Sequence, residues 1–178
     1  DNQVELVLAV GGGSVIDCAK IIAAGVNYEG DPWDFFIHNA RITGALPIGT
    51  VLTLAATGSE MNANAVISNE DTGQKLDISS RHLYPRFSIL DPTLTFTVPP
   101  LQTAAGTADI MSHVFEQYFS PTPGGFIVDR MAEAMLKTCI HYAPIAIAEP
   151  NDYEARANLM WTGTVALNGL LSTGRETD

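Results

Sequence analysis

The sequence has 178 residues, of which 46% are hydrophobic, and this apolar content is enough for a globular core. Its 20 acidic and 9 basic residues give a net charge of −11, which repels phosphate backbones and anionic lipid and so argues against nucleic acid or a membrane surface as a partner. The two cysteines, Cys18 and Cys139, lie far apart in helical patterns, so we expect no disulfide framework and a cytoplasmic protein.

The chain begins with a pattern of strand, glycine turn and helix. The valine-rich run Val4–Val10 predicts a strand buried on both faces of a parallel sheet, and Gly11-Gly12-Gly13 ends it. Ser14 is a favourable N-cap residue, and Asp17 falls in the predicted first turn, where a carboxylate complements the helix dipole. Apolar residues at helical spacing then predict a helix that ends near Gly25.

More strands follow in the first half of the chain. The polar and aromatic segment Asn27–Arg41 predicts a loop with at most one short helix. Strands are predicted at Leu46–Leu54 and Phe87–Leu90, and the arms of a hairpin at Ala65–Ser68 and Lys75–Ile78. Between them, Thr57-Gly58-Ser59-Glu60 predicts a turn that can open a short helix.

The character of the sequence changes near Val98, after which every predicted element is helical. Helices are predicted at Leu101–Ala105, Ala108–Phe119, Phe126–Ala148 and Tyr153–Leu171. Pro144 should kink its helix or end it early, and no apolar run approaches the roughly 20 residues of a membrane span. The sequence therefore predicts an α/β part, residues 1–98, followed by an all-α part, residues 99–178.

The glycine turn is a candidate phosphate site. Gly11-Gly12-Gly13-Ser14 joins a strand to a helix N-terminus, where free backbone N–H groups and the helix dipole favour an anion. Glycine lets a phosphate approach the backbone, and the Ser14 hydroxyl adds a donor. A tight connection without a ligand explains the pattern equally well, because the spacing is neither GxGxxG nor that of a P-loop.

Asp109 and His113 form a candidate metal site. A spacing of four residues places both side chains on one helix face, about 6 Å apart at Cβ, so that carboxylate and imidazole can bind one divalent ion such as iron or zinc. A solvated or hydrogen-bonded pair is the commoner outcome of this spacing, and two ligands make an incomplete site. We expect the other histidines, His38, His82 and His141, to be ordinary surface or helix residues.

A hydroxyl-rich segment follows the second predicted strand. It consists of Thr53, Thr57, Gly58, Ser59 and Glu60. Ligands of open α/β sheets bind at the carboxyl ends of the strands, although turn and cap chemistry explains this segment as well. Lys75, alone on a predicted strand edge, has solvation as its simplest interpretation.

Taken together, these motifs resemble the iron-containing (group III) alcohol dehydrogenase family over nearly the whole chain. The family's long signature is matched in order and spacing by Ser88-Ile89-Leu90-Asp91, Pro99, Ala104, Gly106, Asp109-Ile110-Met111 and Glu116. Gly11–Ser14 with Asp17 and Lys20 resembles its pyrophosphate motif, and Thr57–Glu60 its second cofactor segment. The NADPH-dependent butanol dehydrogenase and aldehyde reductase branch is resembled by Asn27-Tyr28, Asp31-Pro32-Trp33, Val51–Asn62 and Glu116-Gln117-Tyr118.

The resemblance implies a dehydroquinate-synthase-like fold: the second part of a Rossmann-like cofactor domain, residues 1–98, and the start of a helical metal-binding domain, residues 99–178. It also implies which residues form the site. The cofactor, NADP or NAD, would contact Gly11, Gly12, Gly13, Ser14, Thr53, Thr57, Asn64 and Lys75. Asp109 and His113 would bind iron or zinc and act in catalysis. The family commonly has two adjacent threonines where this sequence has Thr53 followed by Leu54, so the resemblance implies one side-chain contact fewer here.

The activity implied is metal-dependent transfer of hydride between a nicotinamide and a small primary alcohol or aldehyde, in a homo-oligomer. The family's remaining metal ligands are histidines beyond Asp178, and the chain opens at Asp1 without Met, so we expect an internal fragment that is inactive alone. Two alternatives stay open. One is a polyol or glycerol dehydrogenase, or a dehydroquinate-synthase-like lyase, of the same fold. The other is a non-catalytic nucleotide-binding module.

Overall fold

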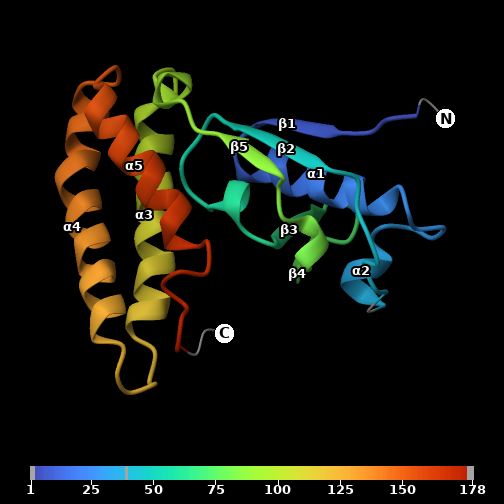
Figure 1. Ribbon diagram of the computed structural model, residues 1–178. Coiled ribbons are helices and arrows are strands. Elements are labelled where there is room, and N and C mark those ends of the chain that lie inside the picture. Colours follow the sequence, from blue (N-terminus) through green and yellow to red (C-terminus); the bar gives the residue numbers. More distant parts are fainter. Residues whose placement is uncertain (1–2, 39, 176–178) are drawn as a thin grey trace. The chain divides into compact units, whose positions relative to one another are not determined.

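The computed structural model describes residues 3–38 and 40–175, which form two compact units (Figure 1). The first unit comprises the chain as far as Leu52 together with Ser59–Ile89. The second comprises Thr53–Gly58 together with the chain from Leu90 onward. The chain therefore passes between the units more than once. A division into domains at residues 98 and 99 stays a prediction.

The first unit is built on a parallel sheet of three strands. β1 (Val7–Gly11), β2 (Ile48–Leu52) and β5 (Phe87–Ile89) lie in the order β1-β2-β5, which confirms the predicted strands with shorter bounds. β1 pairs with β2 from Val7 opposite Ile48 to Gly11 opposite Leu52. Both strands therefore end side by side at the same edge of the sheet.

One face of this sheet is covered and the other is bare. Helix α1 (Gly13–Gly25) packs on β1 and β2, whose side chains Ala9, Ile48 and Leu52 are buried. The opposite face exposes the apolar side chains Leu8, Val10, Phe87 and Ile89. The prediction that the first strand is buried on both faces is therefore wrong for the described residues, because they supply a covering helix on one side alone.

Helix α1 begins two residues earlier than its predicted cap implies. Its N-cap is Gly12, and Ser14 is the second helical residue, so the prediction that Ser14 caps the helix is wrong. The strand runs through Gly11, which leaves a single residue before the helix starts. Asp17 consequently lies beyond the first turn and is buried, rather than exposed at the positive end of the helix dipole.

The predicted hairpin is confirmed as the antiparallel pair β3 (Asn64–Asn69) and β4 (Gln74–Ser79). One of its faces packs into a core with α1, the short helix α2 (Asp34–Ile37) and Leu83. The buried members of that core are Ile21, Ala24, Phe35, Ala65 and Leu83. Short 3-10 turns at Ser59–Met61 and Arg81–Leu83 flank the hairpin, the first of them at the predicted turn.

The second unit consists of three packed helices, α3 (Pro100–Tyr118), α4 (Phe126–Ala148) and α5 (Tyr153–Ala166), preceded by a 3-10 turn at Pro92–Thr95 (Figure 1). Two predicted helices are a single helix, α3, which continues through Gly106. α4 runs from Phe126 through Pro144 to Ala148, which confirms its predicted bounds, so Pro144 does not end the helix early. α5 ends at Ala166 instead of Leu171, ahead of Asn168 and Gly169. No helix within the described ranges is both long and apolar enough to cross a membrane.

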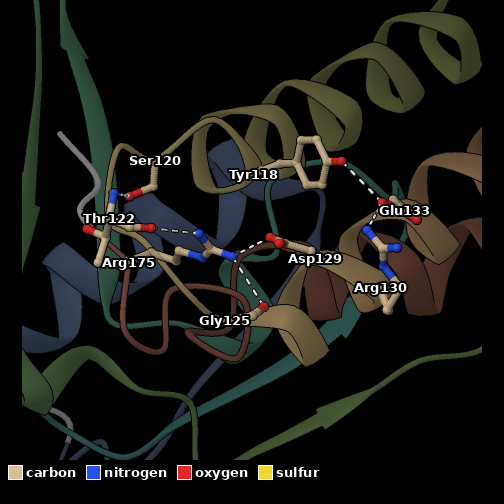
Figure 2. Close-up of polar contacts among 8 residues, drawn as sticks. All are labelled: Tyr118, Ser120, Thr122, Gly125, Asp129, Arg130, Glu133 and Arg175. Carbon is tan, nitrogen blue, oxygen red and sulfur yellow. Dashed lines mark hydrogen bonds and ion pairs between the residues drawn. The ribbon is translucent and has the colours of Figure 1, made fainter.

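Arg175 ties the last described residues to the turn between α3 and α4 (Figure 2). Its guanidinium group donates to the carbonyl oxygens of Thr122 and Gly125, both at 3.3 Å, and forms an ion pair with Asp129. The Arg175 side chain is only 4% exposed, whereas its partner Asp129 is 30% exposed. Arg175 is thereby held beside the start of α4.

Candidate functional site

The glycine turn leaves backbone donors at the start of α1. The N–H groups of Val15 and Ile16 both bond to the carbonyl oxygen of Gly12 at 3.1 Å. Gly13 and Ser14 are the first two helical residues, so no carbonyl oxygen of a preceding turn is available to accept from their N–H groups. A Cβ at Gly11 would lie 2.7 Å from that of Val15, so this close turn requires glycine. The Ser14 side chain is exposed beside these donors. The arrangement suits a phosphate group.

Two buried charges of α1 hold the segments that follow the second strand. Asp17 accepts hydrogen bonds from the Ser59 hydroxyl at 2.5 Å and from the Val66 N–H at 3.0 Å. Lys20, with no exposed surface, donates to the carbonyl and side-chain oxygens of Asn62 and to the carbonyl oxygen of Asn64, at 2.7 to 3.1 Å. Burial lowers the pKa of Lys20 to about 8, although the neighbouring carboxylates of Asp17 and Glu60 act to raise it.

These two residues have structural roles that the sequence did not reveal. Asp17 and Lys20 lie on the apolar side of α1, where charged side chains are rare unless they are paired. Their spacing of three residues was the available signal, but their partners lie more than 40 positions away in the chain. They fix the start of the hairpin to the helix that begins at the glycine turn.

Asn64 and Lys75 share the exposed face of the hairpin. Asn64 pairs with Ser79 and Lys75 with Ser68, and alternation along the strands puts all four side chains on one face, opposite the buried Ala65. Asn64 uses its backbone groups for the bonds to Asn62 and Lys20. Its amide and the Lys75 ammonium group are exposed, so both can meet a ligand.

Thr53 and Thr57 belong to the second unit, in the segment Thr53–Gly58 that packs on α3 and α5. A Cβ at Gly106 of α3 would lie 2.5 Å from the Ala55 carbonyl oxygen, and one at Gly163 of α5 would lie 3.6 Å from the Ala56 nitrogen. The segment therefore approaches α3 as closely as glycine permits and lies in ordinary van der Waals contact with α5. Its contact with α3, at Gly106, is one helical turn before Asp109. The side chains of Thr53 and Thr57 are half-buried.

Asp109 and His113 meet on one face of α3, as predicted. The Asp109 Oδ2 and His113 Nε2 atoms lie 3.5 Å apart, and the two side chains are 43% and 23% exposed. His113 Nε2 is itself buried and has no hydrogen-bond partner among the described residues. Two donors about 2.1 Å from a tetrahedral ion lie roughly 3.4 Å apart, so this spacing and the unpartnered nitrogen fit a divalent metal.

Within the described ranges, no third His, Cys, Asp or Glu side chain completes a metal-binding group. His38 is exposed and paired with Asp34 at 3.0 Å, and His141 is exposed and packs edge-on against Tyr142. These two histidines are the surface and helix residues that the sequence predicted.

Gln117 supports the metal-site helix one turn after His113, and sequence reasoning missed it. Its amide nitrogen donates to the carbonyl oxygens of His113 and Ala166, both at 2.7 Å, and its amide oxygen accepts from the Ser172 hydroxyl at 2.8 Å. Gln117 is 1% exposed, so it joins the end of α5 to α3 inside the core. A buried amide in a helical pattern gave no local signal for this role.

Comparison with known proteins identifies similar sequences along the whole chain. Residues 1–92 match the family described as iron-containing alcohol dehydrogenase, and residues 103–176 match the C-terminal part of the Fe-containing alcohol dehydrogenase family. NADH-dependent butanol dehydrogenase B of Clostridium acetobutylicum is 59% identical over 178 residues, which are 100% of this chain and 46% of that protein. NADPH-dependent aldehyde reductase YqhD of Escherichia coli is 48% identical over 177 residues, 98% of this chain and 46% of that protein.

The structure is similar to solved structures as well. The crystal structure of NADH-dependent butanol dehydrogenase A from Thermotoga maritima has a TM-score of 0.95 and 51% identity, over 98% of this chain and 44% of that one. This similarity confirms the predicted fold class, a sheet-and-helix part followed by helices. The chain spans about half the length of the curated relatives it matches.

Proposed function

The chain belongs to the iron-containing alcohol dehydrogenase family, and we propose that the intact protein is a metal- and nicotinamide-dependent oxidoreductase that interconverts small primary alcohols and aldehydes. The observation that carries this proposal is the Asp109–His113 pair on α3. The His113 Nε2 atom has no hydrogen-bond partner among the described residues and lies 3.5 Å from Asp109 Oδ2. This separation suits two donors of one divalent ion.

Asp109 and His113 are the residues proposed to hold the metal and thereby to act in catalysis. The bound metal would polarise the carbonyl oxygen of an aldehyde as a Lewis acid. Asp109 contributes a negative charge to the site. His113 contributes its Nε2 atom, which makes no hydrogen bond within the described chain. Gln117 keeps the helix in place one turn further on.

The dinucleotide is proposed to bind to Gly11, Gly12, Gly13 and Ser14 and to the side chains of Thr53, Thr57, Asn64 and Lys75. The N–H groups that open α1 suit its pyrophosphate. The exposed Lys75 ammonium group offers a charge for a phosphate, and the Asn64 amide offers both a donor and an acceptor. Leu54 stands where the family commonly has a second threonine. Of these two positions, Thr53 alone would therefore contact the dinucleotide through a hydroxyl group.

The choice between NADP and NAD is part of the proposal. The resemblance to the aldehyde reductase branch favours NADPH, and the relative named NADPH-dependent is 48% identical. Two butanol dehydrogenases of Clostridium acetobutylicum that are named NADH-dependent are each 59% identical, which favours NADH. Butanal reduction by the intact protein, with each cofactor in turn, decides between them through kcat/KM.

The metal assignment is tested with a His113→Ala variant of the intact protein. We expect loss of bound metal and of butanal reduction, with an unchanged circular dichroism spectrum, because the buried His113 Nε2 makes no hydrogen bond in the described chain that the fold would lose. His141→Ala, at an exposed helix position of the same unit, is the matched control and should keep both metal and activity. Elemental analysis also distinguishes iron, which the family name favours, from zinc. A metallated, active His113→Ala enzyme would contradict the proposal.

The same measurements separate the alternatives. A polyol dehydrogenase or a cyclising lyase of this fold would bind metal but leave butanal unreduced. A nucleotide-binding module would bind the dinucleotide but show neither bound metal nor turnover. The 178 residues alone are expected to behave in this way, because their described part supplies only two metal donors, Asp109 and His113. Homo-oligomeric assembly and a cytoplasmic location stay predictions.

A further inference from the structure

Arg156 is a buried charge without a counter-charge. It is only 4% exposed and lies in the first turn of α5. Its Nε donates to the Pro150 carbonyl oxygen at 2.9 Å and its Nη1 to the Thr103 hydroxyl at 2.8 Å. Its Nη2 is buried and has no partner among the described residues, and none of their carboxylates forms an ion pair with it. Burying a guanidinium group in this state destabilises the folded protein, because no neighbouring anion offsets the free energy of removing the charge from water.

The position of Arg156 adds to this cost. The Arg156 N–H bonds to the Asp152 carbonyl oxygen at the start of α5, and the Thr103 N–H bonds to the Pro99 carbonyl oxygen at the start of α3. The positive ends of two helix dipoles therefore lie beside a positive side chain. The Asp152 carboxylate forms no ion pair with Arg156, and it accepts the Ala155 N–H at 2.7 Å as the helix cap. Burial also lowers the pKa of Arg156.

A small pocket lies beside this group, entirely within the second unit. Its volume is about 20 Å³, and Thr95, Gln102, Thr103, Thr107, Arg156 and Leu159 are among its lining residues. The Thr103 hydroxyl accepts from Arg156 and keeps its own proton available for donation. A volume of this size holds one particle about as large as a water molecule, which favours a small ion over phosphate, a carboxylic acid or a nucleotide.

We propose that this pocket binds one small monovalent anion of the size of chloride, held by Arg156 Nη2 and the Thr103 hydroxyl. The anion supplies the missing counter-charge, and it neutralises the helix N-termini at the same time. A water molecule would fit the space and satisfy the donor, but it would leave the charge uncompensated.

The pocket is separate from the proposed metal site. Thr103 and Thr107 lie four residues apart on one face of α3, and at about 100° per residue Asp109 points roughly 160° away from Thr107. Leu54 and Ala55 also line the pocket, so the anion lies behind the segment Thr53–Gly58. Its binding should therefore stabilise this segment without touching the reacting atoms.

Bromide is a suitable probe, because it is close to chloride in size and scatters anomalously. The intact protein is melted at constant ionic strength while potassium bromide replaces potassium gluconate, whose anion is too large for the pocket. We expect the melting temperature to rise by about 2 °C between 1 and 100 mM bromide. Arg156→Gln should abolish the rise, whereas Arg130→Gln, at an exposed arginine of the same unit, should retain it.

Crystals of the wild-type protein soaked in bromide provide a readout that needs no variant. An anomalous peak within hydrogen-bonding distance of Arg156 Nη2 supports the proposal. If Arg156→Gln does not fold, Thr103→Val replaces it and should weaken the bromide response. The proposal is overturned if bromide has no effect on the wild-type protein, or if the pocket contains only water or a carboxylate from another part of the intact protein.

Discussion

Gly106 of α3 lies directly against the carbonyl oxygen of Ala55, so closely that a methyl group at Gly106 would be 2.5 Å from that oxygen. Ala55 is in the middle of the segment Thr53–Gly58, which carries two of the proposed cofactor contacts, and Gly106 is one turn before Asp109. The contact therefore sets the distance between a proposed cofactor segment and the helix of the proposed metal site, both within the second unit.

Replacing Gly106 with alanine should destabilise the protein. Glycine to alanine in a helix normally gains up to about 1 kcal/mol, but here the added methyl group meets a backbone oxygen that has little freedom to move. We expect a net loss of about 1–3 kcal/mol in the free energy of unfolding, measured by urea denaturation. Ala105→Ser, at the exposed neighbouring position, should change stability by less than about 0.5 kcal/mol. A more stable Gly106→Ala protein would show that the segment can move away.

Lys20 gives the stability of the protein a defined pH dependence. Burial lowers its pKa from 10.5 to about 8, so below pH 8 the folded and unfolded states both carry the proton. Between pH 8 and 10.5 only the unfolded state keeps it. The free energy of unfolding contributed by this site therefore rises with pH, by about 1.4 kcal/mol per pH unit.

Lys20→Met should remove this rise. Burial also raises the pKa of Cys139, which makes stability fall at high pH, so the informative quantity is the difference between wild type and variant. Urea denaturation at several pH values from 7.5 to 10 measures that difference. A difference that does not change with pH would mean that Lys20 titrates normally.

The two cysteines should differ sharply in reactivity. Cys139 is buried in the helical core, and burial raises its pKa to about 11, whereas Cys18 is exposed. Since the thiolate is the reactive form, iodoacetamide at pH 8 should modify Cys18 in the folded protein and leave Cys139 intact. Peptide mass analysis with and without urea checks this, because both cysteines should react after unfolding. Equal labelling in the folded state would contradict the burial of Cys139.

Gln117→Leu should weaken the packing of α5 on α3. The change leaves the Ala166 carbonyl oxygen and the Ser172 hydroxyl without their bonds to Gln117 inside the core. We expect a loss of about 2–4 kcal/mol in the free energy of unfolding, since each unsatisfied buried polar group costs about 1–3 kcal/mol. Metal content of the folded fraction should stay unchanged, because Gln117 is not a proposed ligand. Loss of metal without loss of stability would instead assign it to the metal site.

The sequence predicted local features well and long-range contacts poorly. The strands, the hairpin and the pairing of Asp109 with His113 depend on alternation or helical spacing, so neighbouring residues contained the signal. The two helices predicted on either side of Gly106 are one helix, and Gly106 serves the approach of Ala55, a residue about 50 positions earlier. Asp17 was assigned to the helix dipole, because its partner Ser59 could not be read from α1 alone.

The passage of Thr53–Gly58 into the second unit has a consequence for synthesis of the chain. The ribosome releases this segment well before Gly163, the α5 glycine near which it packs. At roughly 5–20 residues per second, the delay of about 100 residues lasts on the order of 5–20 s. During that time the segment lacks α5, and α3 is complete only for about the second half of the interval, while the strands on either side of it can already pair. Its docking on α5 is therefore a late event in folding. No single proteolytic cut separates the two units, because any fragment that holds all of one unit also holds residues of the other.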